Sequence, residues 1–204
     1  MTSILKADTI QDTDGNNIIN ESSDTITIGA SGDTINVPSG ATFNINGTAG
    51  TGIGTNTPYF YGELASDATL TRATTTKVTG MTNDELDSAT AFDGTTFTVP
   101  SGQGGKYYIE GMITGDYGSV GQDGEQTIAF IYKNGSEIKS TKFQSSTSVT
   151  ATGREITVPI SGLFSLSAGD TVEMYAYLQD SSGGNATLQA DYGRTSFMGY
   201  KIIE

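Results

Sequence analysis

The sequence predicts an all-β protein, with a short strand-rich N-terminal part followed by a larger β-sandwich. Three observations support this prediction. No window rich in Ala, Leu, Glu and Lys reaches the length of a helix. Thr, Val, Ile, Tyr and Phe recur in short runs that favour strands. From residue 58 onward, turn signals separate these runs at the spacing typical of a sandwich or jelly roll.

The composition excludes several classes of protein. With no Cys and no His, the chain has no disulfides, no thiolate or imidazole zinc site, and no triad that uses either residue. The net charge of −13 makes nucleic acid and anionic lipid poor partners. No apolar run approaches the roughly 20 residues that span a bilayer, so we expect no membrane insertion. The N-terminal residues also lack the pattern of a secretory signal.

Residues 1–22 predict a short anchor segment built around a hairpin. Asp14-Gly15 lies between short apolar stretches, which is a hairpin-turn signal. The letters around it also resemble the first half of a calcium loop. However, Gly15 directly follows Asp14, and no Glu occupies the position of the bidentate ligand, so we interpret the segment as a turn.

An internal repeat occupies residues 23–47, which we call the stalk. Its units, 24–29, 33–38 and 41–46, each alternate polar and apolar residues, as strands do. One copy buries too little to be stable, so we expect several chains to share a core. The stalk-core residues would be Ile26, Ile28, Ile35, Val37, Phe43 and Ile45. The alternative is a disordered linker.

A Gly/Thr-rich connector marks the domain boundary. The predicted division is therefore 1–22 (anchor), 23–47 (stalk), 48–57 (linker) and 58–204 (sandwich). Within the sandwich we expect strands at or near 59–61, 76–79, 92–99, 105–113, 126–133, 137–141, 154–166, 171–178, 187–190 and 195–204. Asn134-Gly135 predicts a type I′ hairpin. Large side chains flank Gly199 in the last stretch, so we expect a central strand with close contact at this glycine.

Four blocks in residues 58–204 resemble the jelly rolls of the complement globular-head and tumour-necrosis-factor-like family. They are Phe92 to Gly102 with the following Gly105-Lys106-Tyr107-Tyr108, Tyr132 to Gly135, Leu166 to Val172, and Ser196 to Ile202. The resemblance implies a ten-stranded jelly roll that forms a homotrimer. It makes Tyr59, Tyr61, Tyr108, Phe197 and Tyr200 candidates for the trimer seam, or alternatively for the core beside it.

The stretch from Ile4 to Ile19 resembles the start of bacteriophage virion proteins, notably fibres. This resemblance implies a homotrimeric fibre or appendage, assembled in the host cytoplasm onto the virion, with a jelly-roll tip for a host receptor, a glycan or another protein. Attachment to other virion proteins would use Ile4, Leu5, Ile10, Ile18 and Ile19. A capsid decoration protein and a cellular lectin-like binding module are the alternatives. The sequence does not distinguish capsid from tail.

The sequence offers little support for an enzyme. Acidic residues are numerous enough for a glycosidase pair, but the chain lacks the Trp that sugar platforms commonly use. Gly102-Gln103-Gly104-Gly105 has no following Lys-Ser/Thr and so does not match a phosphate loop. We expect no enzyme and no cofactor. Calcium is the one hypothesis left, at Asp84, Glu85 and Asp87 in an acidic loop.

Overall fold

A computed structural model gives the structure of the chain. It describes residues 9–11, 13, 17–22, 25–28, 32, 34–39, 41, 56–82, 86–118, 124–145, 155–181 and 183–202. The chain divides into two compact units, Met1–Gly50 and Thr51–Glu204. Over the described ranges the structure is strand, turn and loop with one short 3-10 turn, η1 (Asp191–Gly193). None of these residues forms a helix of the length and apolar character that would cross a membrane.

The first unit contains one antiparallel sheet in the order β1-β2-β3. The strands are β1 (Thr9–Gln11), β2 (Asn17–Ser22) and β3 (Thr25–Ile28). Pairing of β1 with β2 confirms the predicted hairpin, and β3 brings the first repeat into the same sheet. The sheet therefore extends across the predicted division between anchor and stalk at residue 22. Residues 34–38 of the second repeat form no strand, although their alternation predicts one.

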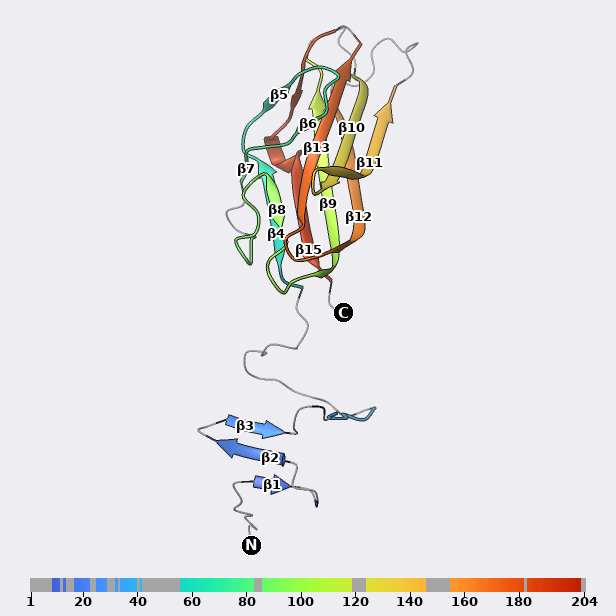
Figure 1. The fold of residues 1–204 in the computed structure, drawn as a ribbon. Coiled ribbons are helices and arrows are strands. Elements are labelled where there is room, and N and C mark those ends of the chain that lie inside the picture. Colours follow the sequence, from blue (N-terminus) through green and yellow to red (C-terminus); the bar gives the residue numbers. More distant parts are fainter. Residues whose placement is uncertain are drawn as a thin grey trace. The chain divides into compact units, whose positions relative to one another are not determined.

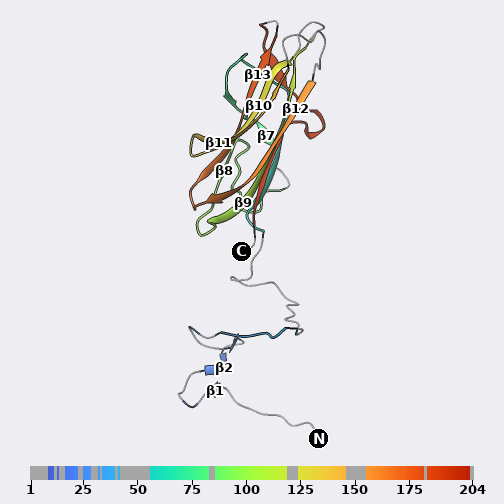
Figure 2. The ribbon, with the colours of Figure 1, turned by 90° about the vertical axis from the view of Figure 1, so that its right-hand side faces the viewer.

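The second unit is a sandwich of two antiparallel sheets, whose long strands run lengthwise through the unit (Figures 1 and 2). The seven-stranded sheet contains β4 (Tyr59–Leu64), β5 (Ala68–Leu70), β7 (Met81–Thr82), β9 (Gly105–Asp116), β12 (Glu155–Leu166), β14 (Ala186–Leu188) and β15 (Ser196–Lys201). The five-stranded sheet contains β6 (Thr76–Lys77), β8 (Thr96–Thr98), β10 (Gly124–Lys133), β11 (Ser136–Gln144) and β13 (Thr171–Asp180). The all-β jelly-roll prediction is confirmed. The short strands bring the number above the ten that the resemblance implies.

Each sheet is organised around one long strand. In the seven-stranded sheet β9 pairs with β12 along one edge, and with β15 and then β14 along the other. In the five-stranded sheet β13 pairs with β10 along one edge, and with β8 and then β6 along the other. These ladders join segments far apart in sequence, which is typical of a jelly roll.

The strand at 196–201 lies in the interior of its sheet, as its apolar sequence predicts. β15 pairs with β9 on one side and with β4 on the other. A Cβ added to Gly199 would lie 2.6 Å from Ile109 Cδ1 and 2.8 Å from Phe60 Cε1. Glycine at this position therefore lets an aromatic ring lie against the strand backbone, which confirms the predicted close contact.

A cluster of phenylalanines joins the two layers. The ring centroid of Phe60 on β4 lies 4.5 Å from that of Phe97 on β8, 4.9 Å from Phe92 and 5.2 Å from Phe197 on β15. All four side chains are at most 2% exposed. Because β4 and β8 belong to different sheets, these contacts hold the sandwich together across its core.

β11 and β12 lie together at one edge of the sandwich, which we call the open edge, and each pairs with a single strand among the described residues. The turn that leads into β11 has positive φ at Asn134 (50°) and Gly135 (75°), which confirms the predicted type I′ hairpin. Lys139 and Lys142 on β11 and Pro159 on β12 disfavour pairing with a further strand. This edge is therefore adapted to side-chain contacts rather than to extension of either sheet.

Candidate functional site: an aromatic face on the seven-stranded sheet

The five predicted seam aromatics all lie on three adjacent strands, β4, β9 and β15, but not all on one face. Phe197 is fully buried and belongs to the phenylalanine cluster of the core. The four tyrosines are partly exposed, and Tyr59 is the most exposed at 39%. Their positions alternate with buried residues along each strand, which places them on the outer face of the sheet.

Strand register arranges this face in three rows, which we call the aromatic face. The first row is Leu163, Tyr108, Tyr200 and Tyr59; the second is Ser161, Glu110, Met198 and Tyr61; the third is Pro159, Met112, Ser196 and Glu63. The rings of Tyr108 and Tyr200 lie 5.5 Å apart. Leu163, at the end of the first row, is 67% exposed. Leu163, Met112 and Met198 are absent from the set predicted from the sequence. Alternation along each strand indicates that they face outward, but only the strand register brings them beside the tyrosines.

Two tyrosine–glutamate pairs supply the charge on the aromatic face. The Tyr61 hydroxyl donates a hydrogen bond to Glu63 Oε1, and the Tyr108 hydroxyl donates to Glu110 Oε2 at 2.5 Å. Partial burial, and then the Glu63 carboxylate, raise the pKa of Tyr61 to about 12. The hydrogen bond to Glu110 is the main cause of the raised pKa of Tyr108. Both carboxylates thus have a partner within the chain, which lowers the cost of covering this face.

Raised tyrosine pKa values predict alkaline instability. Burial also raises the pKa of Tyr107 and of Tyr117 to about 12. Between about pH 10 and 12 the unfolded chain loses protons that the folded chain keeps, so the free energy of unfolding falls as the pH rises. Absorbance titration should show a late tyrosine phase that diminishes in Tyr117→Phe. A titration in which all tyrosines ionise together near pH 10 would contradict the prediction.

A groove of about 450 Å³ adjoins the aromatic face at the open edge of the sandwich. Its lining comes from three strands: Glu110 on β9, Pro159, Ile160 and Ser161 on β12, and Lys139 and Thr141 on β11. Glu110, Ser161 and Pro159 also belong to the rows of the aromatic face. The face and the groove are therefore one continuous surface across four neighbouring strands and the edge strand of the opposite sheet.

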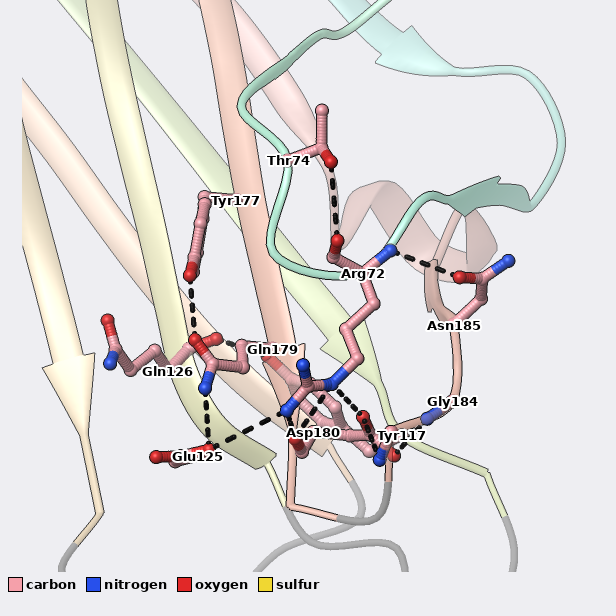
Figure 3. A network of polar contacts seen from close by, with 11 residues as sticks. Arg72, Thr74, Tyr117, Glu125, Gln126, Tyr177, Gln179, Asp180, Gly184 and Asn185 are labelled. Carbon is pink, nitrogen blue, oxygen red and sulfur yellow. Dashed lines mark hydrogen bonds and ion pairs between the residues drawn. The ribbon is translucent and has the colours of Figure 1, made fainter.

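A polar network stabilises the other end of the sandwich, where β9 and β13 end (Figure 3). Arg72 Nε donates to Asp180 Oδ1 at 2.8 Å, and Arg72 Nη2 lies 4.0 Å from Glu125. The Asp180 side chain is 1% exposed and also accepts the backbone N–H groups of Gly183 and Gly184. Internal partners therefore engage this carboxylate, and the network joins the segment around Arg72 to the loop that follows β13.

The calcium hypothesis remains a hypothesis. Asp84 and Glu85 lie outside the described residues. The Asp87 carboxylate accepts backbone N–H groups from Ala91 at 3.0 Å and Phe92 at 3.0 Å, and so it stabilises its own loop. No group of three or more acidic residues suited to a metal ion occurs in the part of the chain that the structure describes.

The predicted stalk and anchor residues are only partly described. In the first unit Ile26, Ile28, Ile35 and Val37 are exposed to 68%, 56%, 62% and 44%, and Ile10 and Ile19 to 38% each. Ile18 lies in β2. Ile4, Leu5, Phe43 and Ile45 lie outside the described residues. Every described apolar side chain of the two predicted sets therefore remains available for contact with another molecule.

Comparison with known proteins supports the fold and does not show a family. No protein-family model matches the sequence, and no curated protein matches it either. Among solved structures, the chain is similar to Eiger TNF from S. frugiperda, with 9% identity and a TM-score of 0.50 over 71% of this chain and 90% of that one. It is also similar to murine APRIL, with 10% identity and a TM-score of 0.50 over 71% and 98%. The globular domain of zebrafish complement 1qA matches at 16% identity with a TM-score of 0.47 over 71% and 97%.

The second unit is thus a jelly roll with the fold of tumour-necrosis-factor-like proteins. At such low identity the likeness concerns the fold alone. The outstanding features of its surface are the aromatic face and the adjoining groove.

Proposed function

We propose that the chain is a structural virion protein of a bacteriophage, a homotrimeric fibre or appendage that is not an enzyme. The aromatic face is the observation on which the assembly part of this proposal rests. It carries tyrosine, methionine and leucine side chains across four strands, with Leu163 67% exposed. An apolar patch of this extent on a chain with a net charge of −13 is typical of an interface rather than of free surface.

The distribution of residues over this surface favours a closed ring of copies over a two-fold dimer. The apolar face on β4, β9 and β15 differs in chemistry from the edge groove, where Lys139 and Thr141 approach from β11. These two regions of one continuous surface differ in chemistry and lie on different strands, which suits a head-to-tail contact in which the edge of one copy meets the face of the next and the ring closes. Three copies is the number that the jelly-roll resemblance implies.

The virion part of the proposal rests on the N-terminal sequence. The stretch from Ile4 to Ile19 resembles the start of phage virion proteins, and Ile4 and Leu5 are its first apolar residues. We assign residues 1–22 to contact with another virion protein, and the outward surface of the jelly roll to contact with a host receptor, a glycan or a neighbouring protein. Assembly in the host cytoplasm fits a chain without Cys. The alternative placement is as a capsid decoration protein with the same assembly.

Mass measurement of the full chain tests the assembly. Light scattering at micromolar concentration should give three times 21.3 kDa. Combining Leu163→Ser with Tyr200→Ser removes two members of the first row and should weaken association by at least about tenfold. Tyr192→Ser, at a site 96% exposed and outside the rows, is the matched control and should keep the trimer. The proposal would be overturned if the wild-type protein had the mass of a monomer, or if the double variant folded and kept the mass of the wild-type assembly.

Electron microscopy tests the place on the particle. An antibody against the jelly roll should label phage particles, on the tail for a fibre or on the head for a decoration protein. Particles that contain the chain by mass spectrometry support the virion assignment. Absence of the chain from every purified particle rejects it and leaves a cellular binding module.

A further inference from the structure

The sheet of the first unit carries an uninterrupted row of isoleucines. Ile10 on β1 is the register partner of Ile19 on β2, and Ile19 is the register partner of Ile28 on β3. The three side chains are 38%, 38% and 56% exposed. Ile26, two positions before Ile28 and so on the same face of β3, is 68% exposed. We call these four residues the isoleucine face.

This sheet cannot account for its own stability. Its strands have three, six and four residues, and the described residues of Met1–Gly50 contain no second layer. Ile35 and Val37, outside the sheet, are exposed as well. A single short layer with its apolar face in water does not bury enough surface to offset the entropy of ordering. The isoleucine face therefore needs a cover.

The chemistry of the face limits what that cover can be. Glu21 is the only ionisable residue in β1, β2 and β3, and it pairs in register with Ile26. One acidic position beside Ile26 gives the face little charge with which to select a partner, so the partner has to present a mainly apolar and regularly spaced surface. A second copy of the same row meets this requirement, because strands repeat about every 4.8 Å and facing sheets lie about 10 Å apart.

We propose that the isoleucine face is covered by the isoleucine faces of other copies, as a second self-association surface that folds only in the assembly. This inference rests on the proposed homotrimer. Copies joined through their jelly rolls raise the effective concentration of the N-terminal sheets to roughly millimolar, where a weak apolar contact suffices. Within residues 1–22 it gives Ile10 and Ile19 to contact between copies, and it leaves Ile4, Leu5 and Ile18 for attachment to another virion protein.

Hydrogen exchange on the full chain tests the inference, with two variants at one position. Thr and Val have nearly the same shape, so Ile19→Thr and Ile19→Val differ mainly in a hydroxyl in place of a methyl group. Backbone amides of β2 should be protected in the wild-type trimer, keep most of that protection in Ile19→Val, and lose at least about tenfold in Ile19→Thr. Ile138→Thr, at an equally exposed site (38%) on β11, should change nothing in β2.

Cross-linking identifies the covering molecule. Because the chain has no cysteine, Ile26→Cys provides a single reporter. Mild oxidation should give disulfide-linked dimers in this variant. It should give far fewer when Ile19→Thr is added, because the jelly rolls still hold the copies together while the contact between isoleucine faces is lost. Equal dimer yields in both backgrounds would overturn the proposal.

The two proposals fail in distinguishable ways. A trimer whose β2 amides exchange freely, or are equally protected in Ile19→Thr, overturns the isoleucine-face contact and leaves the jelly-roll trimer intact. A monomeric protein with protected β2 amides overturns both the homotrimer and the contact between isoleucine faces. Protection in β2 that persists when Leu163→Ser and Tyr200→Ser have separated the jelly rolls at high dilution shows that the sheet needs no other copy, which also overturns the inference.

Discussion

Replacing Phe60 with Ala should lower the free energy of unfolding of the jelly roll by about 3–5 kcal/mol. The ring is 2% exposed and lies within 4.5–5.2 Å, centroid to centroid, of Phe97, Phe92 and Phe197. Its removal leaves a cavity at the junction of the two sheets, where β4 and β15, each paired with a strand on both sides, have little freedom to collapse. Urea denaturation followed by tyrosine fluorescence measures the loss.

Two further variants define what that loss means. Phe60→Leu keeps most of the volume and should cost clearly less than Phe60→Ala. Tyr192→Ala removes a side chain that is 96% exposed and should change stability by no more than about 0.5 kcal/mol. If Phe60→Ala costs no more than Tyr192→Ala, the phenylalanine cluster is not what joins the layers.

Arg72→Met should cost about 3 kcal/mol, because it leaves the carboxylate of Asp180 buried without its guanidinium. The Asp180 side chain is 1% exposed, whereas that of Arg72 is 31% exposed, so solvent screening moderates the effect. Arg72 also donates from Nη2 to the backbone oxygen of Asp180 at 2.7 Å, which a lysine cannot reproduce together with the ion pair. Arg72→Lys should therefore recover only part of the loss.

A double-mutant cycle tests the coupling of this pair. Asp180→Asn removes the charge, so Arg72→Met combined with Asp180→Asn should cost less than the sum of the two single changes. Chemical denaturation of the four proteins provides the comparison. Strict additivity would contradict the ion pair as a source of stability.

The sequence predicted the features that depend on short stretches. Asn134-Gly135 gave the hairpin because both positions need positive φ, and Gly199 gave the close contact because no side chain fits there. The sequence did not predict β5 and β7, because strands of three and two residues are too short to show an alternation of apolar and polar residues. The strand predicted at residues 34–38 is not formed. Alternation of polar and apolar residues marks a potential strand, but a strand also needs a neighbouring strand to pair with.

The candidate site was predictable in kind but not in extent. Tyr107 and Tyr108 are adjacent, yet the first is fully buried, with its hydroxyl donating to the Gln103 backbone oxygen at 2.6 Å, while the second lies on the outer face. Alternation along a strand predicts that adjacent side chains lie on opposite faces of the sheet, and only the tertiary arrangement decides which of the two faces water. Leu163 joins the aromatic face through its register with Tyr108, a pairing that no local pattern encodes.

The place of β15 between β4 and β9 has a consequence for how the chain is made. Until β15 leaves the ribosome, the one strand partner of β4 among the described residues is the two-residue β7. β9 then has β12 and β14 but an open edge where β15 will pair. Tyr59 cannot pair with Tyr200 until the end of β15 has been made, and such pairing between residues far apart in sequence slows folding. The nascent jelly roll is thus two incomplete half-sheets, and a single late strand closes both ladders at once. Expression and chaperone demand should depend more on that strand than on any other.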